Sequence, residues 1–363
     1  MRCYNGDYHT DVFEEERLAA RIASGAERVL FWGPPDDVAR AAELFRTDGC
    51  PDDAVLDGLS LGTHTTLPGG ELYGPGHIEV ARTGSTQSDS AGAAAAIMWD
   101  LGRVLAGARP GETFHTISCV PRNRPSAPGI PGGAAIHRLH TRAIGSRHWG
   151  IAPFYVMAGG VLEVLDYREL SLDDEAVPGG FASGGPVYVS DAASADLVTG
   201  LCELNGFSVD VRTRTAAPLA LKQPQAPRSS AATSSPHGPR AVHVDVEDPL
   251  PALADAAVGR GEACTVAVCD LSDERSVAAQ KTLLGQGFRL TYISPPKAVA
   301  RQDGATAPQR VPLRGGFCRI RTGAPPIPPY YLERGPLSDA EKNLASQYRD
   351  IFDAWRRDAN SRV

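Results

Sequence analysis

Residues 270–290, DLSDERSVAAQKTLLGQGFRL, decide the fold class that the sequence predicts. The stretch starts at the end of an apolar run, passes through a polar turn and continues with apolar residues at helical spacing. Gly285 and Gly287 end this helical pattern, and an apolar segment follows from Phe288. This order predicts a strand, a helix and a second strand joined by short turns, which is typical of an α/β protein.

The same order occurs in residues 190–207, SDAASADLVTGLCELNGF. A helix expected over 191–204 ends at Gly206, and Phe207 begins the next strand. A Pro- and Ser-rich linker is expected over 214–240. The expected strands are 27–33, 77–82, 134–143, 186–190, 207–211, 241–246, 264–271, 288–293 and 316–321. The other expected helices are 11–24, 36–47, 91–105, 149–167, 249–258, 272–284 and one starting at Ser338. Gly/Pro-rich loops are expected at 68–76, 121–133 and 295–312.

Composition limits the classes of function. The chain has 363 residues, 42% of them hydrophobic and 22% charged, and a net charge of −7. Its basic residues are scattered among acidic ones, which argues against a nucleic-acid partner. No apolar run reaches ~18 residues and the acidic N-terminus differs from a signal peptide, so we expect a cytoplasmic protein without a membrane partner. The Ala, Gly, Pro and Arg content indicates a GC-rich genome, such as an actinobacterial one.

The cysteines predict neither a disulfide framework nor a structural zinc site. Seven are present, an odd number, and none forms a C-x-x-C pair. We therefore expect no metal cofactor and mostly buried thiols in a reducing compartment.

The two helix–Gly–Phe units resemble the closing β–α–β of the GNAT acyltransferase family, in which the last helix ends in Gly-Phe and the next strand packs beside it. Residues 76–323, about two thirds of the chain, are similar to a degenerate GNAT-like region. The resemblance implies an α/β fold with a twisted mixed sheet flanked by helices, and the recurrence suggests two GNAT-like halves. The expected domains are an N-terminal α/β extension at 1–75, halves at 76–213 and 241–335 around the linker, and a C-terminal helix at 336–363.

The functional signature of that family is Gln/Arg-x-x-Gly-x-Gly/Ala at the start of a helix, where backbone N–H groups bind the pyrophosphate of acyl-CoA. One match occurs at residues 147–152, RHWGIA, at the start of the expected helix 149–167. The resemblance therefore implies that Arg147, Gly150 and Ala152 bind acyl-CoA. An ordinary strand–turn–helix junction is the other interpretation.

A dense polar turn at residues 82–90 is a candidate site for an anionic substrate group, because it precedes an expected helix N-terminus. Helix capping by Ser88 or Asp89 explains the same residues without a substrate. The substrate-binding candidates in this turn are Arg82, Ser85, Thr86 and Gln87, and Asp89 is a catalytic candidate.

Histidines supply the other catalytic candidates. His137 and His140 point to opposite faces of the expected strand 134–143, which argues against a shared metal ion. His140 shares a face with Arg142, so we consider His140 as a general base and Arg142 as a substrate-binding residue, against the alternative of solvated side chains. His115 is a third candidate, although its own strand places it too far from Cys119 for direct pairing.

Three functions remain open from the residues. The first is a biosynthetic enzyme of secondary metabolism that transfers an acyl group from acyl-CoA to an amine, which requires a base and oxyanion donors. The second is a GNAT-like enzyme without CoA that performs ring closure or group displacement on an amino-acid-derived metabolite. The third is a partner-dependent non-catalytic subunit. A small-molecule substrate with an anionic group fits the first two, and a homo- or hetero-oligomer is open in all three.

Overall fold

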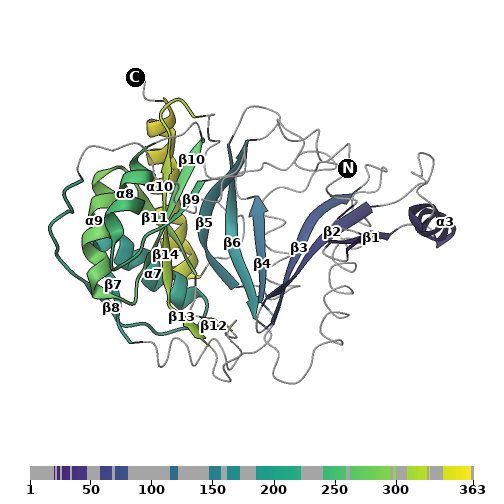
Figure 1. Ribbon diagram of the computed structural model, residues 1–363, viewed down its shortest axis with the longest axis horizontal. Coiled ribbons are helices and arrows are strands. Elements are labelled where there is room, and N and C mark those ends of the chain that lie inside the picture. The colour runs from purple at the N-terminus through teal and green to yellow at the C-terminus, as the bar shows by residue number, and fades with distance from the viewer. Residues whose placement is uncertain are drawn as a thin grey trace.

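The structure is a computed structural model with mixed α/β content. The residues it describes are 20, 23–24, 27–32, 35–46, 58–67, 70–80, 115–121, 147–156, 162–171, 185–221, 240–258, 262–294, 297–299, 309–324, 327 and 338–360. These residues form one ten-stranded mixed sheet, two two-stranded sheets and five α-helices (Figure 1). The strands are β1 (Glu27–Trp32), β2 (Gly58–Leu67), β3 (Gly70–Val80), β4 (His115–Pro121), β5 (Arg147–Val156), β6 (Leu162–Ser171), β7 (Val187–Val189), β8 (Val211–Thr213), β9 (Arg240–His243), β10 (Cys264–Asp270), β11 (Arg289–Ser294), β12 (Lys297–Val299), β13 (Gln309–Val311) and β14 (Arg314–Ile320). The helices are α3 (Pro35–Arg46), α7 (Ala192–Leu204), α8 (Pro249–Ala257), α9 (Val277–Gly285) and α10 (Asp339–Asn360).

The large sheet has the order β1-β2-β3-β4-β6-β5-β11-β14-β10-β9. Neighbouring strands are antiparallel except for two parallel pairs, β3 with β4 and β10 with β9. The parallel strands β7 and β8 form one small sheet, and the antiparallel strands β12 and β13 form the other. Figure 1 shows α7 to α10 gathered around the C-terminal strands, whereas β1 to β4 and α3 extend toward the opposite end.

The core of the C-terminal part lies between these helices and strands. Its largest fully buried side chains include Phe288, Phe317, Phe352 and Trp355. Helix α8 packs against β9 and β10, and α9 packs against β10 and α8. Helices α8 and α9 therefore cover β9 and β10, while α7 packs against β11 and α10 against β14, the four strands whose ends carry the candidate site.

A buried arginine connects the start of β9 to the end of α8. The Arg240 guanidinium donates hydrogen bonds to the carbonyl oxygens of Asp255 and Val258, both at 2.9 Å, and pairs with the Asp255 carboxylate. A cation at the C-terminus of a helix also interacts favourably with the helix dipole. Arg240 therefore fixes α8 relative to β9.

Helices α7 and α9 end in the same motif. In both helices a Gly with positive φ follows the last turn, Gly206 at 78° and Gly287 at 83°. The motif is the Schellman cap, which satisfies two carbonyl groups of the last turn. Its hydrogen bonds are Phe207 N–H to Cys202 O at 2.9 Å and Gly206 N–H to Glu203 O at 3.0 Å in α7, and Phe288 N–H to Leu283 O and Gly287 N–H to Leu284 O, both at 3.0 Å, in α9.

The helix predicted over 149–167 is wrong. These residues lie largely in β5 and β6, which form an antiparallel pair from Arg147 opposite Glu169 to Val156 opposite Leu162. Apolar segments of this length fit a buried strand as well as a helix, and periodicity alone does not separate the two. Pro153 is tolerated within β5 because it lies at a register shift.

The loop predicted over 68–76 is also wrong over most of its length, because β3 begins at Gly70. Pro75 lies opposite Gly62, beside a shift of register in β2, where the missing proline N–H is tolerated. The domain boundary expected after residue 75 falls inside this strand. The strand expected over 207–211 begins only at Val211.

Strand β2 was not predicted, and β12 and β13 lie within the loop expected over 295–312, so that expectation is wrong there. The other described elements agree with the sequence predictions within a few residues. The helix expected over 272–284 consists of a 3₁₀ turn, Glu274–Ser276, followed by α9. The expected start of α10 is confirmed, because Ser338 N–H donates to Glu341 Oε2 at 2.7 Å and Glu341 N–H donates to Ser338 Oγ at 3.2 Å. The helix expected at 91–105 and the strand expected at 134–143 lie outside the described residues.

Candidate functional site

Three strands end together at one edge of the large sheet. Strand β10 is parallel to β9, and both β10 and β11 are antiparallel to β14, so β9, β10 and β11 run in the same direction. Their last residues are His243, Asp270 and Ser294, and Arg314 begins β14 at the same edge. We call these four residues the carboxyl-edge site. Ligands of open α/β sheets bind outside the carboxyl ends of codirectional strands, where strand order changes direction.

The side chains of this site project from one face of the sheet. In the β-ladders, Asp270 lies directly opposite Arg314, and Arg314 lies directly opposite Ser294. Residues that are directly opposite share a face, and successive residues alternate between faces. His243 is exposed between buried Val242 and Val244, and it lies opposite Val268, two residues before Asp270. The four polar side chains therefore share a partly exposed face.

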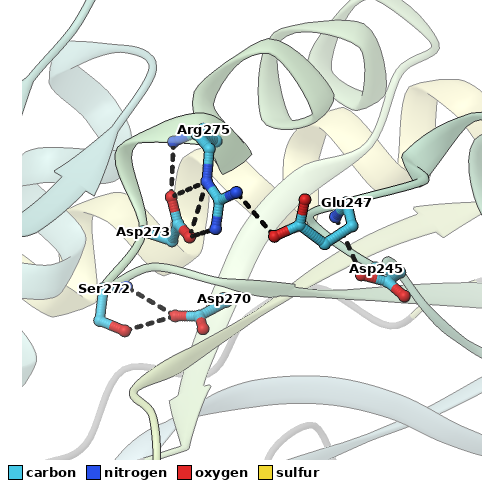
Figure 2. A network of polar contacts seen from close by, with 6 residues as sticks. All are labelled: Asp245, Glu247, Asp270, Ser272, Asp273 and Arg275. Atoms are coloured by element: carbon cyan, nitrogen blue, oxygen red, sulfur yellow. Dashed lines mark hydrogen bonds and ion pairs between the residues drawn. The ribbon is translucent and has the colours of Figure 1, made fainter.

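Asp270 is held by the turn that follows β10. Its Oδ1 atom accepts hydrogen bonds from the Ser272 N–H at 2.8 Å and from the Ser272 hydroxyl at 2.6 Å (Figure 2). These bonds direct Asp270 toward its own turn. Within the described part of the chain, the guanidinium of Arg314 forms neither an ion pair nor a hydrogen bond.

An exposed charge network lies beside the site, between the turns that follow β9 and β10. Arg275 donates to the Asp273 carboxylate, with Nη2 to Oδ2 at 2.6 Å, and to Glu247 Oε1 at 2.7 Å (Figure 2). The Glu247 N–H in turn donates to Asp245 Oδ1 at 2.9 Å. Hydrogen bonds from Arg275 lower the pKa of Asp273. The charge of Arg275 is thus matched by two carboxylates, which leaves this edge with an excess of negative charge.

His243 is kept in its neutral form. Partial burial of the imidazole, and then the positive charge of Arg314, lower the pKa of His243 below its ordinary value. At neutral pH a ring nitrogen can therefore accept a proton from a bound substrate. The site thus combines a proton acceptor, a guanidinium, a carboxylate and a hydroxyl on one partly exposed face.

A second polar cluster is closed to solvent. His148 Nε2 lies 2.6 Å from Tyr348 Oη, His148 Nδ1 lies 3.8 Å from Asp166 Oδ2, and the Arg168 Nε lies 3.6 Å from the same oxygen. All four side chains are at most 4% exposed. The cluster joins β5 and β6 to α10, and its burial fits a structural role in docking that helix.

The residues predicted as an acyl-CoA site do not lie at a helix N-terminus. Arg147, Gly150 and Ala152 lie in β5, whose N–H groups belong to a sheet. Gly150 is explained by packing, since a Cβ there would lie 2.3 Å from the Cα atom of Tyr292 in β11. This corrects the expected strand–turn–helix context, and the pyrophosphate interpretation loses its structural basis.

The other predicted site residues are not brought together by the described structure. His115 is the first residue of β4, which confirms the strand expected there. The remaining candidates, Arg82, Ser85, Thr86, Gln87, Asp89, His140 and Arg142, lie outside the described residues.

Cys202, Cys264, Cys269 and Cys318 are buried free thiols. Burial raises the pKa of Cys202 to about 12 and raises the pKa values of Cys264 and Cys269 well above the ordinary range. Such thiols are poor nucleophiles. Among the described residues, no group of three or more His, Cys, Asp or Glu is arranged to hold a metal ion.

The carboxyl-edge residues were not predicted as a site, although the sequence carries a signal for them. Asp270 closes an apolar strand and is followed by a polar turn, and His243 is a polar residue within the apolar strand expected over 241–246, just before the acidic residues Asp245 and Glu247. Because two such strand ends belong to parallel neighbours, their polar residues meet in space. That β14 lies on the other side of β10 and starts at the same edge with Arg314 could not be foreseen without the order of the strands.

Comparison of the chain with family models, with curated proteins and with solved structures finds no match. None of the helices in the described parts of the chain has the length and apolar character needed to cross a bilayer.

Proposed function

We propose that this chain is a biosynthetic enzyme that acts on a small, amino-acid-derived metabolite at the carboxyl-edge site, with His243 as the general base. The observation that carries the proposal is an imidazole, His243, that shares one face of the sheet with a guanidinium, Arg314, which has no ion pair or hydrogen bond in the described part of the chain, at the sheet edge where α/β folds bind ligands. Titratable groups with shifted pKa values in such positions are characteristic of functional sites.

The chemistry begins at a substrate amine. An amine is a nucleophile only without its extra proton, and a neutral imidazole within reach of the amine removes that proton. The excess of carboxylates around the site favours the approach of a cationic amine. His243, as the base, then retains the proton while the amine attacks.

The proposed scaffold is GNAT-like, which rests on the unit formed by α9, Gly287, Phe288 and β11. The favoured reaction does not use CoA, because residues 147–152 lie in a strand and the charge excess of the carboxyl edge repels a pyrophosphate. Ring closure or displacement of a group within one metabolite needs only the base and the site that orients it. Acyl transfer from acyl-CoA to the same amine is the alternative.

Thermal melting with acetyl-CoA and with CoA separates the two reactions. A ligand present at 100 times its dissociation constant adds about 2.7 kcal/mol to the free energy of unfolding. We expect no saturable rise in Tm with either compound up to millimolar concentration. A saturable rise would overturn the CoA-independent assignment and favour acyl transfer.

A comparison of metabolite extracts tests His243. The purified wild-type protein is incubated with a small-molecule extract of a host that lacks the gene, next to His243→Gln and to the matched control Asp196→Asn, an exposed residue of α7. We expect the wild type and Asp196→Asn to consume the same metabolite, and His243→Gln to consume it at least ~100-fold more slowly. Equal consumption by His243→Gln would refute the role of this base.

A further inference from the structure

Two opposite charges lie side by side in the carboxyl-edge site without pairing. Arg314 and Asp270 are direct partners in the β10–β14 ladder, and directly opposite residues have Cβ atoms about 4.5–5.5 Å apart. At this separation an ion pair is the usual outcome. Here the Asp270 carboxylate bonds to Ser272, and Arg314 forms no ion pair or hydrogen bond in the described part of the chain.

We propose that Arg314 and Asp270 together bind a zwitterion, so that the substrate is a free α-amino acid or a close derivative with both charges intact. This inference rests on the proposed function and names its substrate class. The substrate carboxylate lies on the guanidinium of Arg314, and the substrate ammonium lies at Asp270.

The two groups suit this task chemically. A guanidinium binds a carboxylate through two parallel N–H···O bonds, a geometry that Lys cannot reproduce. On Asp270, Ser272 occupies Oδ1, and Oδ2 accepts no hydrogen bond in the described structure. The hydrogen bonds from Ser272 hold the carboxylate in place, so the site needs little reorganisation when a ligand arrives.

The surroundings argue against a simpler anion. Asp245, Glu247 and Asp273 lie beside the site, and Arg275 is already engaged with two of these carboxylates. A phosphate dianion would bring more negative charge to an edge that already has an excess of it. A carboxylate that carries its own ammonium adds no net charge, and its positive end meets Asp270.

The site also places the substrate ammonium next to the proposed base. His243 lies on the face of Asp270, close enough to Arg314 for the guanidinium charge to act on it. An ammonium held at Asp270 is therefore presented to the base. Loss of its proton to His243 gives the neutral amine and an imidazolium, with the charge conserved.

Calorimetric titration of the wild-type protein tests the zwitterion site. The probes are the twenty L-α-amino acids, their N-acetyl derivatives, which lack the ammonium, and the corresponding decarboxylated amines. We expect at least one amino acid to bind, and its N-acetyl and amine analogues to bind at least ~10-fold more weakly, because each leaves one buried or partly buried charge of the site unpaired. If no amino acid binds, or if both analogues bind as well, the inference is wrong.

Variants test which side chain binds which charged group of the amino acid. In Arg314→Gln the amino acid and its amine should bind equally, and in Asp270→Asn the amino acid and its N-acetyl derivative should bind equally. Arg314→Lys keeps the charge but should lose most of the preference, and it replaces Arg314→Gln if that variant does not fold. Exposed Arg289 at the other end of β11 and Asp196 provide the controls Arg289→Gln and Asp196→Asn, which should bind as the wild type does. Unchanged preferences in the site variants would overturn the assignment.

The two proposals fail separately. His243→Gln should bind the amino acid with unchanged affinity and lose turnover. If binding shows the charge preferences but His243→Gln retains turnover, the general base is wrong and the zwitterion site stands. If turnover needs His243 but no charge preference exists, the zwitterion inference is wrong and the general base stands.

Discussion

The chain contains two helix–Gly–Phe units that are locally alike and globally different. Helices α7 and α9 both end in a Schellman cap, with the same two hydrogen bonds and a glycine at positive φ. Phe288, after α9, is 1% exposed and lies in the core, with the Arg319 guanidinium 4.6 Å from its ring centroid. Phe207, after α7, is only partly buried and stacks on Trp149 at 5.8 Å.

The strands that follow the two units differ still more. Strand β11 contributes buried Leu290 and Ile293 and lies in the large sheet beside β14. Strand β8 is half-exposed to exposed and, among the described strands, pairs with β7 alone. The six residues of the Schellman cap therefore determine how each helix ends. The apolar content of the strand that follows determines which sheet that strand joins. Both helices pack on the large sheet, α7 on β5 and β11 and α9 on β10, but only the strand that follows α9 joins that sheet.

The largest expected difference between the units lies in their phenylalanines. Phe288→Ala should lower the free energy of unfolding by roughly 3–5 kcal/mol, the range for a fully buried aromatic residue, and Phe207→Ala by about half of that. Urea denaturation of both variants measures the two values. Equal losses in the free energy of unfolding would show that both phenylalanines contribute equally to the core, and would contradict the difference between the two units.

Much of the C-terminal architecture could be predicted because local signals and tertiary structure agree there. Asp191, Gly206, Gly287 and Ser338 mark helix ends through backbone hydrogen bonds that depend on a few neighbouring residues. The region of β5 and β6 could not be predicted in this way, since its apolar residues suit a buried strand and a buried helix alike. Only the partner strands decide between the two.

The candidate site was beyond prediction for a related reason. Asp270 and Arg314 are far apart in sequence and become neighbours only because β14 inserts between β10 and β11. A motif search favours residues close in sequence, such as 147–152, and that match lies in a strand. The polar residue at the end of each strand was visible, but the strand order that collects these residues was not.

Substitution of the cap glycine should destabilise the protein to the same extent in both units, and by less than Phe288→Ala does. A Cβ at Gly206 would meet no atom within 4 Å, and at Gly287 only the Arg319 Cδ at 4.0 Å, so a substitution acts through backbone strain. Gly206→Ala and Gly287→Ala should each lower the free energy of unfolding by about 1–2 kcal/mol. Chemical denaturation compares the two values directly.

Gly285 provides the matched control for the caps. It lies within α9 with open space at its Cβ position and an ordinary helical φ. Gly285→Ala should therefore raise the free energy of unfolding by about 0.5–1 kcal/mol. A loss at Gly285 as large as at Gly287 would mean that the positive φ is not the cause.

The smallest expected effect concerns the pH dependence of stability and comes from His243 at the end of β9. His243 has a pKa below its unfolded value of about 6.5, so between these values the unfolded chain binds more protons than the folded chain. The free energy of unfolding must then fall as the pH drops through about 6.5, and His243→Gln should lack this component.

Urea denaturation of the wild type and of His243→Gln between pH 8 and pH 5 tests this. The difference in their free energies of unfolding should be constant above about pH 7, and below it the wild type should lose stability relative to the variant. The control Asp196→Asn, at an exposed position of α7, should show the same pH dependence as the wild type between pH 6 and 8. If the wild type gained on His243→Gln at low pH, the imidazole would be stabilised in its charged form, and the assignment of His243 as a neutral base beside Arg314 would fail.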